Sequence, residues 1–151
     1  MSLESDIDYF DTIKINNFYA VNIVSVGLDA NIGNSARKYK RISFLPAELA
    51  YFISLIYNII YIKSFNIKIT IDDTNYIEDY LIYSIGSGKY FGGGMKVLPY
   101  ADCQDVLLDI CHVKPLKRLN VIQLLSRFVK GRHTDIKELS FKKAIPVYIS
   151  K

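Results

Sequence analysis

The chain has 151 residues, of which 50% are hydrophobic and 23% are charged. This length is enough for one compact domain, and this composition excludes a disordered chain. The formal net charge of +4 is compatible with anionic lipid, nucleotide or phosphate partners. It is too small for the basic footprint of a nucleic-acid-binding protein. We therefore expect a single domain over residues 1–151 that binds no nucleic acid.

Hydrophobic alternation with period two predicts strands in the first half of the chain. The segments Ile13–Ile15 and Phe18–Val26 read as a hairpin around Asn16-Asn17, and Ala30–Lys40 reads as a first helix. A second hairpin is predicted for the alternating isoleucines of 67–71 and for Tyr76–Ile85.

The longest apolar segment, Leu45–Ile62, is interrupted by Pro46, Glu48 and Asn58, which argues against a membrane span. A helix that begins at Pro46 is predicted instead. Its apolar face carries Leu49, Phe52, Ile53, Ile56 and Ile60, and its other face carries Tyr51, Ser54, Asn58 and Tyr61. We expect the apolar face to be buried or interfacial.

The second half continues the mainly β pattern. A strand is predicted over Val106–Val113, a helix from Pro115 that ends at Gly131, and a strand over Ile136–Ile149 in which Pro146 marks an edge or bulge. The chain is therefore expected to be α+β, mainly β, with about three helices. The two cysteines have no zinc-binding or disulfide spacing, and no signal peptide precedes them, so a cytoplasmic location is expected.

Five of the eight glycines fall between Gly86 and Gly94, directly after a predicted strand. Glycine tolerates positive φ and close backbone approach, so this cluster predicts a tightly shaped loop at a sheet edge. The triplet Gly92, Gly93 and Gly94 is open to two interpretations. Its backbone amides could cradle a phosphate, or it could allow close sheet packing.

Several short motifs in a fixed order carry a family resemblance. They are Asn22, Ser25-Val26-Gly27-Leu28-Asp29-Ala30, Lys38-Tyr39-Lys40, Ala50-Tyr51, Gly86, Tyr90-Phe91-Gly92-Gly93-Gly94-Met95, Pro99, Ala101, Asp105 and Gly131-Arg132-His133. In this order the chain, from about Asp6 onward, resembles the C-terminal domain of the diacylglycerol kinase and sphingosine kinase-like lipid kinases. The resemblance implies an antiparallel β-sandwich-like domain.

The resemblance also implies an activity that needs more than this chain. Such kinases bind ATP on an N-terminal domain through a Gly-Gly-Asp-Gly-Thr loop, which is absent from this sequence, and carry a catalytic acidic residue in a later Asp-Gly-Glu motif. The resemblance implies that ATP is the phosphate donor, Mg²⁺ the cofactor, and a lipid alcohol such as diacylglycerol the acceptor. This chain alone is expected to be inactive.

Site residues follow from the same resemblance. Asp105 matches an aspartate that holds Mg²⁺, with backbone groups of Asp102 and Leu107 as further ligands. The alternative for Asp105 is that it starts a strand or caps a turn. The family usually has glycine at the next position, where this chain has Val106. Asp29, together with Gly92, Gly93 and Gly94, is expected at the substrate cleft. An ordinary helix N-cap before Ala30 is the alternative for Asp29.

Basic residues and tyrosines suggest partners. Exposed lysines and arginines could attract the protein to anionic membranes, or could simply be solvated helix faces. The Tyr-lined helix 46–62 could form a homodimer. Three functions therefore remain open: the lipid-binding half of a kinase, a non-catalytic lipid- or phosphate-binding β module, and a structural dimerisation domain.

Overall fold

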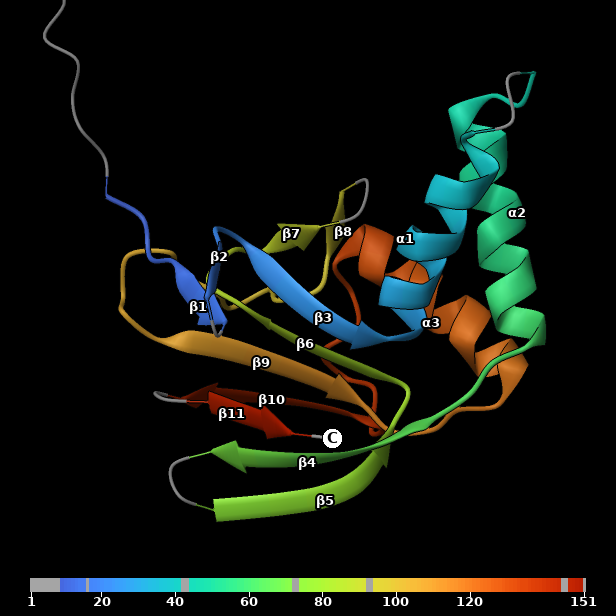
Figure 1. Ribbon diagram of the computed structural model, residues 1–151. Coiled ribbons are helices and arrows are strands. Elements are labelled where there is room, and N and C mark those ends of the chain that lie inside the picture. The colour runs from blue at the N-terminus through green and yellow to red at the C-terminus, as the bar shows by residue number, and fades with distance from the viewer. Residues whose placement is uncertain are drawn as a thin grey trace, which may run out of the picture.

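Strand β6 (Ile82–Gly86) is buried on both faces, and its alternate side chains enter two different cores. Ile82 packs with residues of the helices, whereas Tyr83 and Ile85 pack with isoleucines of strand β4 (Phe65–Ile71). The sheet that contains β6 is therefore the middle of three layers. Figure 1 shows this arrangement in a computed structural model, which describes residues 9–15, 17–41, 44–71, 74–91, 94–144 and 147–150.

Two antiparallel sheets form the sandwich. The middle sheet has the order β10-β9-β6-β3, with β3 at Ile23–Gly27, β9 at Leu108–Val113 and β10 at Leu139–Ala144. The outer sheet has the order β11-β4-β5, with β5 at Thr74–Tyr80 and β11 at Val147–Ser150. Two small hairpins complete the strands: β1 (Ile13–Ile15) with β2 (Phe18–Ala20), and β7 (Tyr90–Phe91) with β8 (Met95–Lys96).

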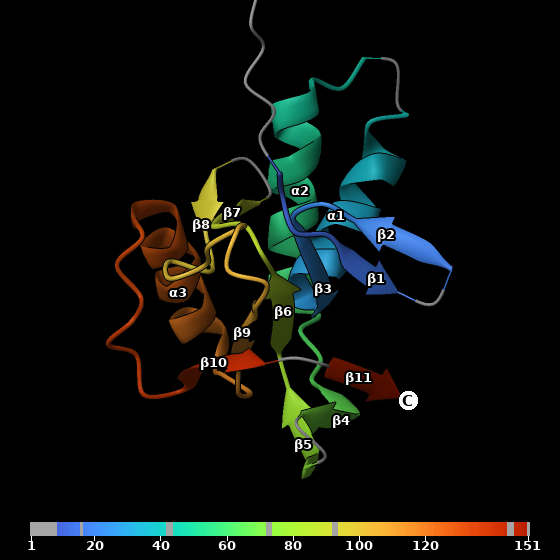
Figure 2. The same ribbon diagram turned by 90° about the vertical axis from the view of Figure 1, so that its left-hand side faces the viewer.

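The helices cover the other face of the middle sheet. They are α1 (Leu28–Tyr39), α2 (Ala47–Ile60) and α3 (Arg118–Lys130). Helices α1 and α2 lie side by side and extend away from the sheet, as both ribbon views show (Figures 1 and 2). Helix α3 ends at Gly131, whose φ of 63° closes the helix in the left-handed region, as the sequence predicts. The predicted α+β class and the sandwich-like architecture are thus confirmed.

Three predicted strands are wrong as continuous elements. The segment Phe18–Val26 divides into β2 and β3, Tyr76–Ile85 contributes to β5 and β6, and Ile136–Ile149 contains β10 and β11. In each case the two parts belong to different sheets. The division is invisible to hydrophobic periodicity because the alternation continues while the chain passes from one sheet to another. Pro146, expected at an edge or bulge, lies outside the described residues.

Helix α2 turns its predicted apolar face to the surface, so burial of that face is wrong, and the interfacial alternative stays a prediction. Of its predicted polar face, only Ser54 is fully buried: the Ser54 hydroxyl donates to the Ile32 carbonyl of α1 at 2.7 Å, whereas Tyr61 is 63% exposed. The neighbouring Ala50 is fully buried as well. The small Ala50 and Ser54 side chains allow close packing against α1, which periodicity alone does not reveal. The five residues of the predicted apolar face are between 37% and 56% exposed: Leu49, Phe52, Ile53, Ile56 and Ile60.

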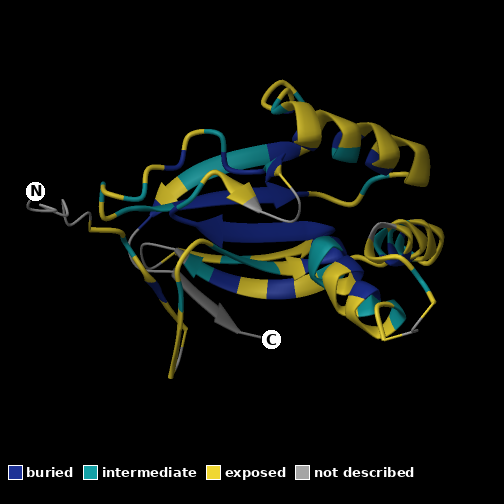
Figure 3. Ribbon diagram, turned by 90° about the horizontal axis from the view of Figure 1, so that it is seen from above, coloured by how far each residue is buried: buried dark blue, intermediate teal, exposed yellow. Residues whose placement is uncertain are grey.

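Figure 3 shows this contrast between the exposed helix surfaces and the dark blue, buried strands of the middle sheet. Within the described ranges, every helix is too short or too polar to cross a bilayer.

Candidate functional site

A row of polar side chains crosses the middle sheet on its helix-covered face. Ser25 of β3 stands opposite Ser84 of β6, and Ser84 stands opposite Cys111 of β9. The two serine hydroxyls share a hydrogen bond of 2.8 Å. The Ser25 hydroxyl also donates to the Tyr83 carbonyl oxygen at 3.3 Å. Ser84 is completely buried, so the pair satisfies its hydroxyl within the core.

A tight turn after β3 brings Asp29 over this row. Gly27 has a φ of 112°, and the next residue, Leu28, donates its N–H to the Leu81 carbonyl at 2.9 Å. A Cβ on Gly27 would lie only 2.3 Å from the Leu81 carbonyl oxygen. Because only glycine accepts both this φ and this approach, the Gly27-Leu28-Asp29 sequence fixes where α1 begins. Asp29 therefore lies in the first turn of the helix.

Both carboxylate oxygens of Asp29 are buried and make no hydrogen bond of ordinary geometry. Burial raises the pKa of this carboxyl above its usual value, although the nearby Ser25 hydroxyl and Ala30 N–H lower it in part. The N-cap of α1 is Gly27, and no side chain caps the helix, so the alternative role of Asp29 as an N-cap is wrong. Neither the Ser25 nor the Ala30 contact reaches ordinary hydrogen-bond geometry, and a buried carboxylate that is so weakly compensated is costly, so Asp29 is a candidate position for a ligand.

Two further groups face Asp29. Burial and the Asp29 charge together raise the pKa of the Tyr51 hydroxyl on α2, and they raise the pKa of the Cys111 thiol to about 12. The thiol is therefore neutral and unreactive near pH 7. The sequence motifs include Ser25 and Tyr51 without giving them a role, and no motif identifies Ser84 or Cys111 as site residues. Strand register brings Ser25, Ser84 and Cys111 together, and the turn into α1 and the packing of α2 on α1 add Asp29 and Tyr51.

Asn22 holds the described part of the glycine loop. The Asn22 side-chain amide donates to the Tyr90 carbonyl at 2.7 Å, and the backbone carbonyl of Asn22 accepts the Ser87 N–H at 3.0 Å. A Cβ on Gly88 would lie 2.0 Å from the Asn22 side-chain oxygen, so this loop needs glycine for close approach. Gly94 has a φ of 94°, and a Cβ added to it would point into open space, so the positive φ and not close packing is what favours glycine there. Gly92 and Gly93 lie outside the described residues.

The loop around Asp105 binds its own chain. Asp105 Oδ1 accepts the Leu107 N–H at 3.0 Å, and its Oδ2 lies 2.6 Å from the Lys143 ammonium. Asp102 Oδ1 accepts the Gln104 N–H at 3.1 Å. Among the described residues, no three His, Cys, Asp or Glu side chains are grouped as metal ligands. An ammonium against the carboxylate and an N–H donor from Leu107 do not fit a divalent cation here.

Val106 stands in this loop with a φ of 61°, a conformation that a β-branched residue rarely adopts. We expect Val106→Gly to raise stability by about 1 kcal/mol, and the melting temperature by about 2–4 °C, because relief of strain exceeds the added chain entropy. Thermal unfolding of the purified chain measures this. The side chain is 69% exposed, so little packing is lost.

Val129→Gly is the matched control, because Val129 is 63% exposed and lies within helix α3. Glycine there is expected to lower the melting temperature slightly. Equal losses in the two variants would show that Val106 carries no backbone strain.

Two hollows of the described surface lie beside helix α3 and do not include Asp29. One of about 290 Å³ is lined by α3 and by the segment that contains Asp135 and Ile136. Arg127 and Asp135 in its wall pair with each other at 2.9 Å. We assign no ligand to this hollow, because the only cation among the described residues of its wall, Arg127, is already paired with Asp135.

Comparisons with known proteins agree with the fold. A diacylglycerol kinase of Mycobacterium tuberculosis is 24% identical over 128 residues, which cover 84% of this chain and 40% of that protein. A Staphylococcus aureus protein described as a candidate lipid kinase is 27% identical over 103 residues, 68% of this chain and 33% of its own length. A solved Bacillus anthracis structure, described as a candidate diacylglycerol kinase, superposes with a TM-score of 0.65 at 24% identity. The superposition covers 93% of this chain and 46% of the solved Bacillus anthracis chain.

The chain thus spans less than half the length of these relatives. The profile of one family, the YegS C-terminal NAD kinase beta sandwich-like domain, matches residues 22–151. That match covers most of the chain and includes β3, the Gly27 turn and Asp29. The chain therefore belongs to this family, the C-terminal domain of diacylglycerol kinase-like lipid kinases, as the ordered motifs predicted.

Proposed function

We propose that this chain is the lipid-binding half of an ATP-dependent lipid kinase. In the parent protein, an N-terminal domain outside this chain would bind ATP and Mg²⁺, and this domain would present a lipid alcohol such as diacylglycerol. The 151-residue chain alone would form one domain and would not catalyse transfer. Family membership and the names of its relatives support the kinase class. The acceptor lipid, Mg²⁺ and ATP are part of the proposal.

The unpartnered Asp29 carboxylate is the observation that carries this proposal. It lies at a strand-to-helix turn, above a row of hydroxyl groups, with both oxygens buried and unbonded. An alcohol is a hydrogen-bond donor of matching chemistry, and a hydrogen bond to a charged acceptor is stronger than one between neutral groups. Asp29 would accept the hydrogen bond of the lipid hydroxyl and orient its oxygen.

The chemistry explains the need for such a group. In phosphoryl transfer the acceptor oxygen forms the new bond to the γ-phosphorus, loses its proton to a base, and ADP leaves. Catalysis depends on how precisely the acceptor is positioned. A carboxylate with a raised pKa also interacts more favourably with a proton donor than an ordinary one does. In this proposal Asp29 positions the hydroxyl, and the base belongs to the segment outside this chain.

A transfer assay tests the proposal. The full-length parent is incubated with ATP labelled at the γ-phosphate and with diacylglycerol, a sphingoid base or a polyprenol in mixed micelles. We expect label in one lipid class, only when ATP and Mg²⁺ are both present. Transfer to none of these lipids would overturn the proposal.

A non-catalytic lipid- or phosphate-binding module is the second candidate. It is favoured by one observation: the Asp105 loop holds the Lys143 ammonium and the Leu107 N–H where the family resemblance implies a metal ion. This function predicts saturable lipid binding by the isolated chain and no transfer by the parent. The two assays together therefore separate the two functions.

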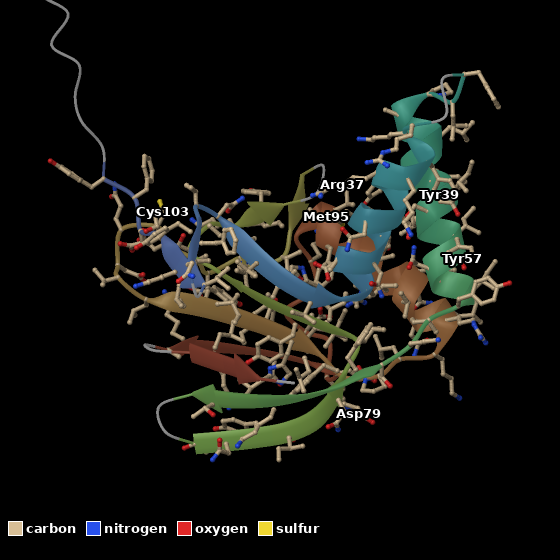
Figure 4. All side chains as sticks on the ribbon, viewed as in Figure 1. Arg37, Tyr39, Tyr57, Asp79, Met95 and Cys103 are labelled. Atoms are coloured by element: carbon tan, nitrogen blue, oxygen red, sulfur yellow. The ribbon has the colours of Figure 1, made fainter. Side chains whose placement is uncertain are left out.

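The exposed face of α2 supports a peripheral membrane contact within the proposed function. Phe52 and Ile56 are 56% and 43% exposed on this face, and exposed basic residues of α1, Arg37 and Lys38 among them, lie on the neighbouring helix. Figure 4 shows Arg37 on α1 and Tyr57 on α2. Apolar side chains beside cations are typical of surfaces that bind anionic bilayers. We propose a cytoplasmic protein that meets the membrane through α2.

Vesicle sedimentation tests this surface. The chain is expected to bind vesicles with anionic lipid more tightly than neutral ones, and Phe52→Asp/Ile56→Asp is expected to lower binding at least about tenfold, because burying two apolar side chains contributes a few kcal/mol. Ile77→Asp is the control, since Ile77 is 63% exposed but lies on β5 of the outer sheet.

Two results would argue against the membrane surface. The first is an equal loss of vesicle binding in the Ile77→Asp control. The second is a concentration-dependent dimer that Phe52→Asp/Ile56→Asp abolishes, which would assign the face to a homodimer instead.

A further inference from the structure

One ammonium group stands between two carboxylates where β9 and β10 meet the Asp105 loop. Lys143 of β10 is directly opposite Asp109 of β9. Its Nζ lies 2.6 Å from Asp105 Oδ2 and 3.3 Å from Asp109 Oδ2. The Asp109 side chain is only 8% exposed, and those of Lys143 and Asp105 are 37% and 26% exposed. The three groups form a partly buried network rather than an isolated surface pair.

Asp109 needs this cation more than Asp105 does. Burial raises the pKa of the Asp109 carboxyl, whereas the hydrogen bond from Lys143 lowers the pKa of Asp105. Asp109 Oδ2 has no hydrogen bond of ordinary geometry, so the Lys143 charge is its compensation. Removing one member of such a pair leaves an uncompensated buried charge, which strongly destabilises a fold.

The network also fixes the loop that follows Asp102. With Oδ2 held by Lys143, Asp105 uses Oδ1 to accept the Leu107 N–H. The intervening Val106 directs its own N–H to Asp11 Oδ2 at 2.8 Å. Asp11 in turn donates its backbone N–H to the Cys103 carbonyl at 2.8 Å. The loop is thereby joined to the 9–11 segment by contacts within the chain.

We propose that the Lys143 ammonium is the resident cation of this loop, in place of the divalent cation that the family resemblance implies beside Asp105. The shape of the loop, and the folding of the domain around it, then need no divalent cation. This inference does not depend on the proposed lipid kinase function, since its test measures folding.

The first test is thermal unfolding of the 151-residue chain in EDTA and in millimolar Mg²⁺ or Ca²⁺. The expected melting temperatures are the same under all three conditions. A melting temperature that falls in EDTA, or that rises as Mg²⁺ or Ca²⁺ is titrated in, would overturn the proposal by showing a metal site.

The second test removes the cation. Lys143→Met is expected to lower the melting temperature by several degrees, and Asp109→Asn/Lys143→Met to recover most of that loss, because the buried charge is then gone as well. Lys114→Met is the matched control: its exposed pair with Glu78, at 3.0 Å, is expected to contribute little.

Two outcomes of this second test would overturn the proposal. One is a Lys143→Met variant whose melting temperature equals that of the Lys114→Met control. The other concerns a Lys143→Met variant that does not fold at all. In that case, an Asp109→Asn/Lys143→Met variant that also fails to fold would overturn the proposal.

Discussion

Gly27→Ala is expected to abolish cooperative folding of the domain or to reduce its stability by about 3–5 kcal/mol. The new Cβ would lie 2.3 Å from the Leu81 carbonyl oxygen, and the backbone φ of 112° disfavours any side chain. The same carbonyl accepts the Leu28 N–H that starts α1, so neither strand nor helix can move without losing this bond. Thermal and urea unfolding followed by circular dichroism measure the effect.

Gly33→Ala is the internal control for this substitution. Gly33 lies in the same helix and is exposed, and a Cβ added there would have no other atom within 4 Å. Alanine is the better helix former by about 1 kcal/mol, so this variant is expected to be more stable than the natural chain. Equal effects of the two substitutions would contradict the structure of the turn.

Asp29→Asn is expected to stabilise the isolated chain near pH 7 by about 1–2 kcal/mol, because it removes a buried charge without a partner. The gain depends on pH. The pKa of Asp29 is higher in the folded chain than in the unfolded one, so the folded state binds its proton more tightly. The stability of the natural chain therefore rises as the pH falls through the pKa of Asp29 in the folded state. The rise ends at the pKa of Asp29 in the unfolded state, which is about 4.

The advantage of Asp29→Asn should accordingly shrink as the pH is lowered from 7 toward about 4. Melting temperatures of both proteins over this range give the comparison. Asp102→Asn is the control, since Asp102 is exposed and is expected to give no comparable gain. A variant that is less stable than the natural chain near pH 7 would show that Asp29 has a stabilising partner within the fold.

The sequence predicted the class of the fold because alternation and glycine signals are local. The helix end at Gly131 and the hairpin of β1 with β2 follow from such signals. The division of Tyr76–Ile85 between two sheets does not, since a strand that changes sheets keeps the same alternation. The orientation of α2 was missed for a related reason. Ser54 is buried because its hydroxyl reaches the Ile32 carbonyl, which is a tertiary contact.

The candidate site was predictable only in part. The motif around Asp29 identified the carboxylate, but the hydroxyl row of Ser25 and Ser84 depends on strand register, which no single segment encodes. The metal role of Asp105 followed from the resemblance, and Val106 was the one local sign against it. Lys143 lies 38 residues away, so its contact with Asp105 could not be read from sequence.

Steady-state phosphate transfer by the full-length parent shows whether Asp29 binds the hydroxyl of the acceptor lipid. With Asp29→Asn, kcat/KM for the lipid is expected to fall about 10- to 100-fold, the cost of losing one charged hydrogen bond, while KM for ATP stays the same. An unchanged kcat/KM for the lipid, in a variant that folds, would contradict the account.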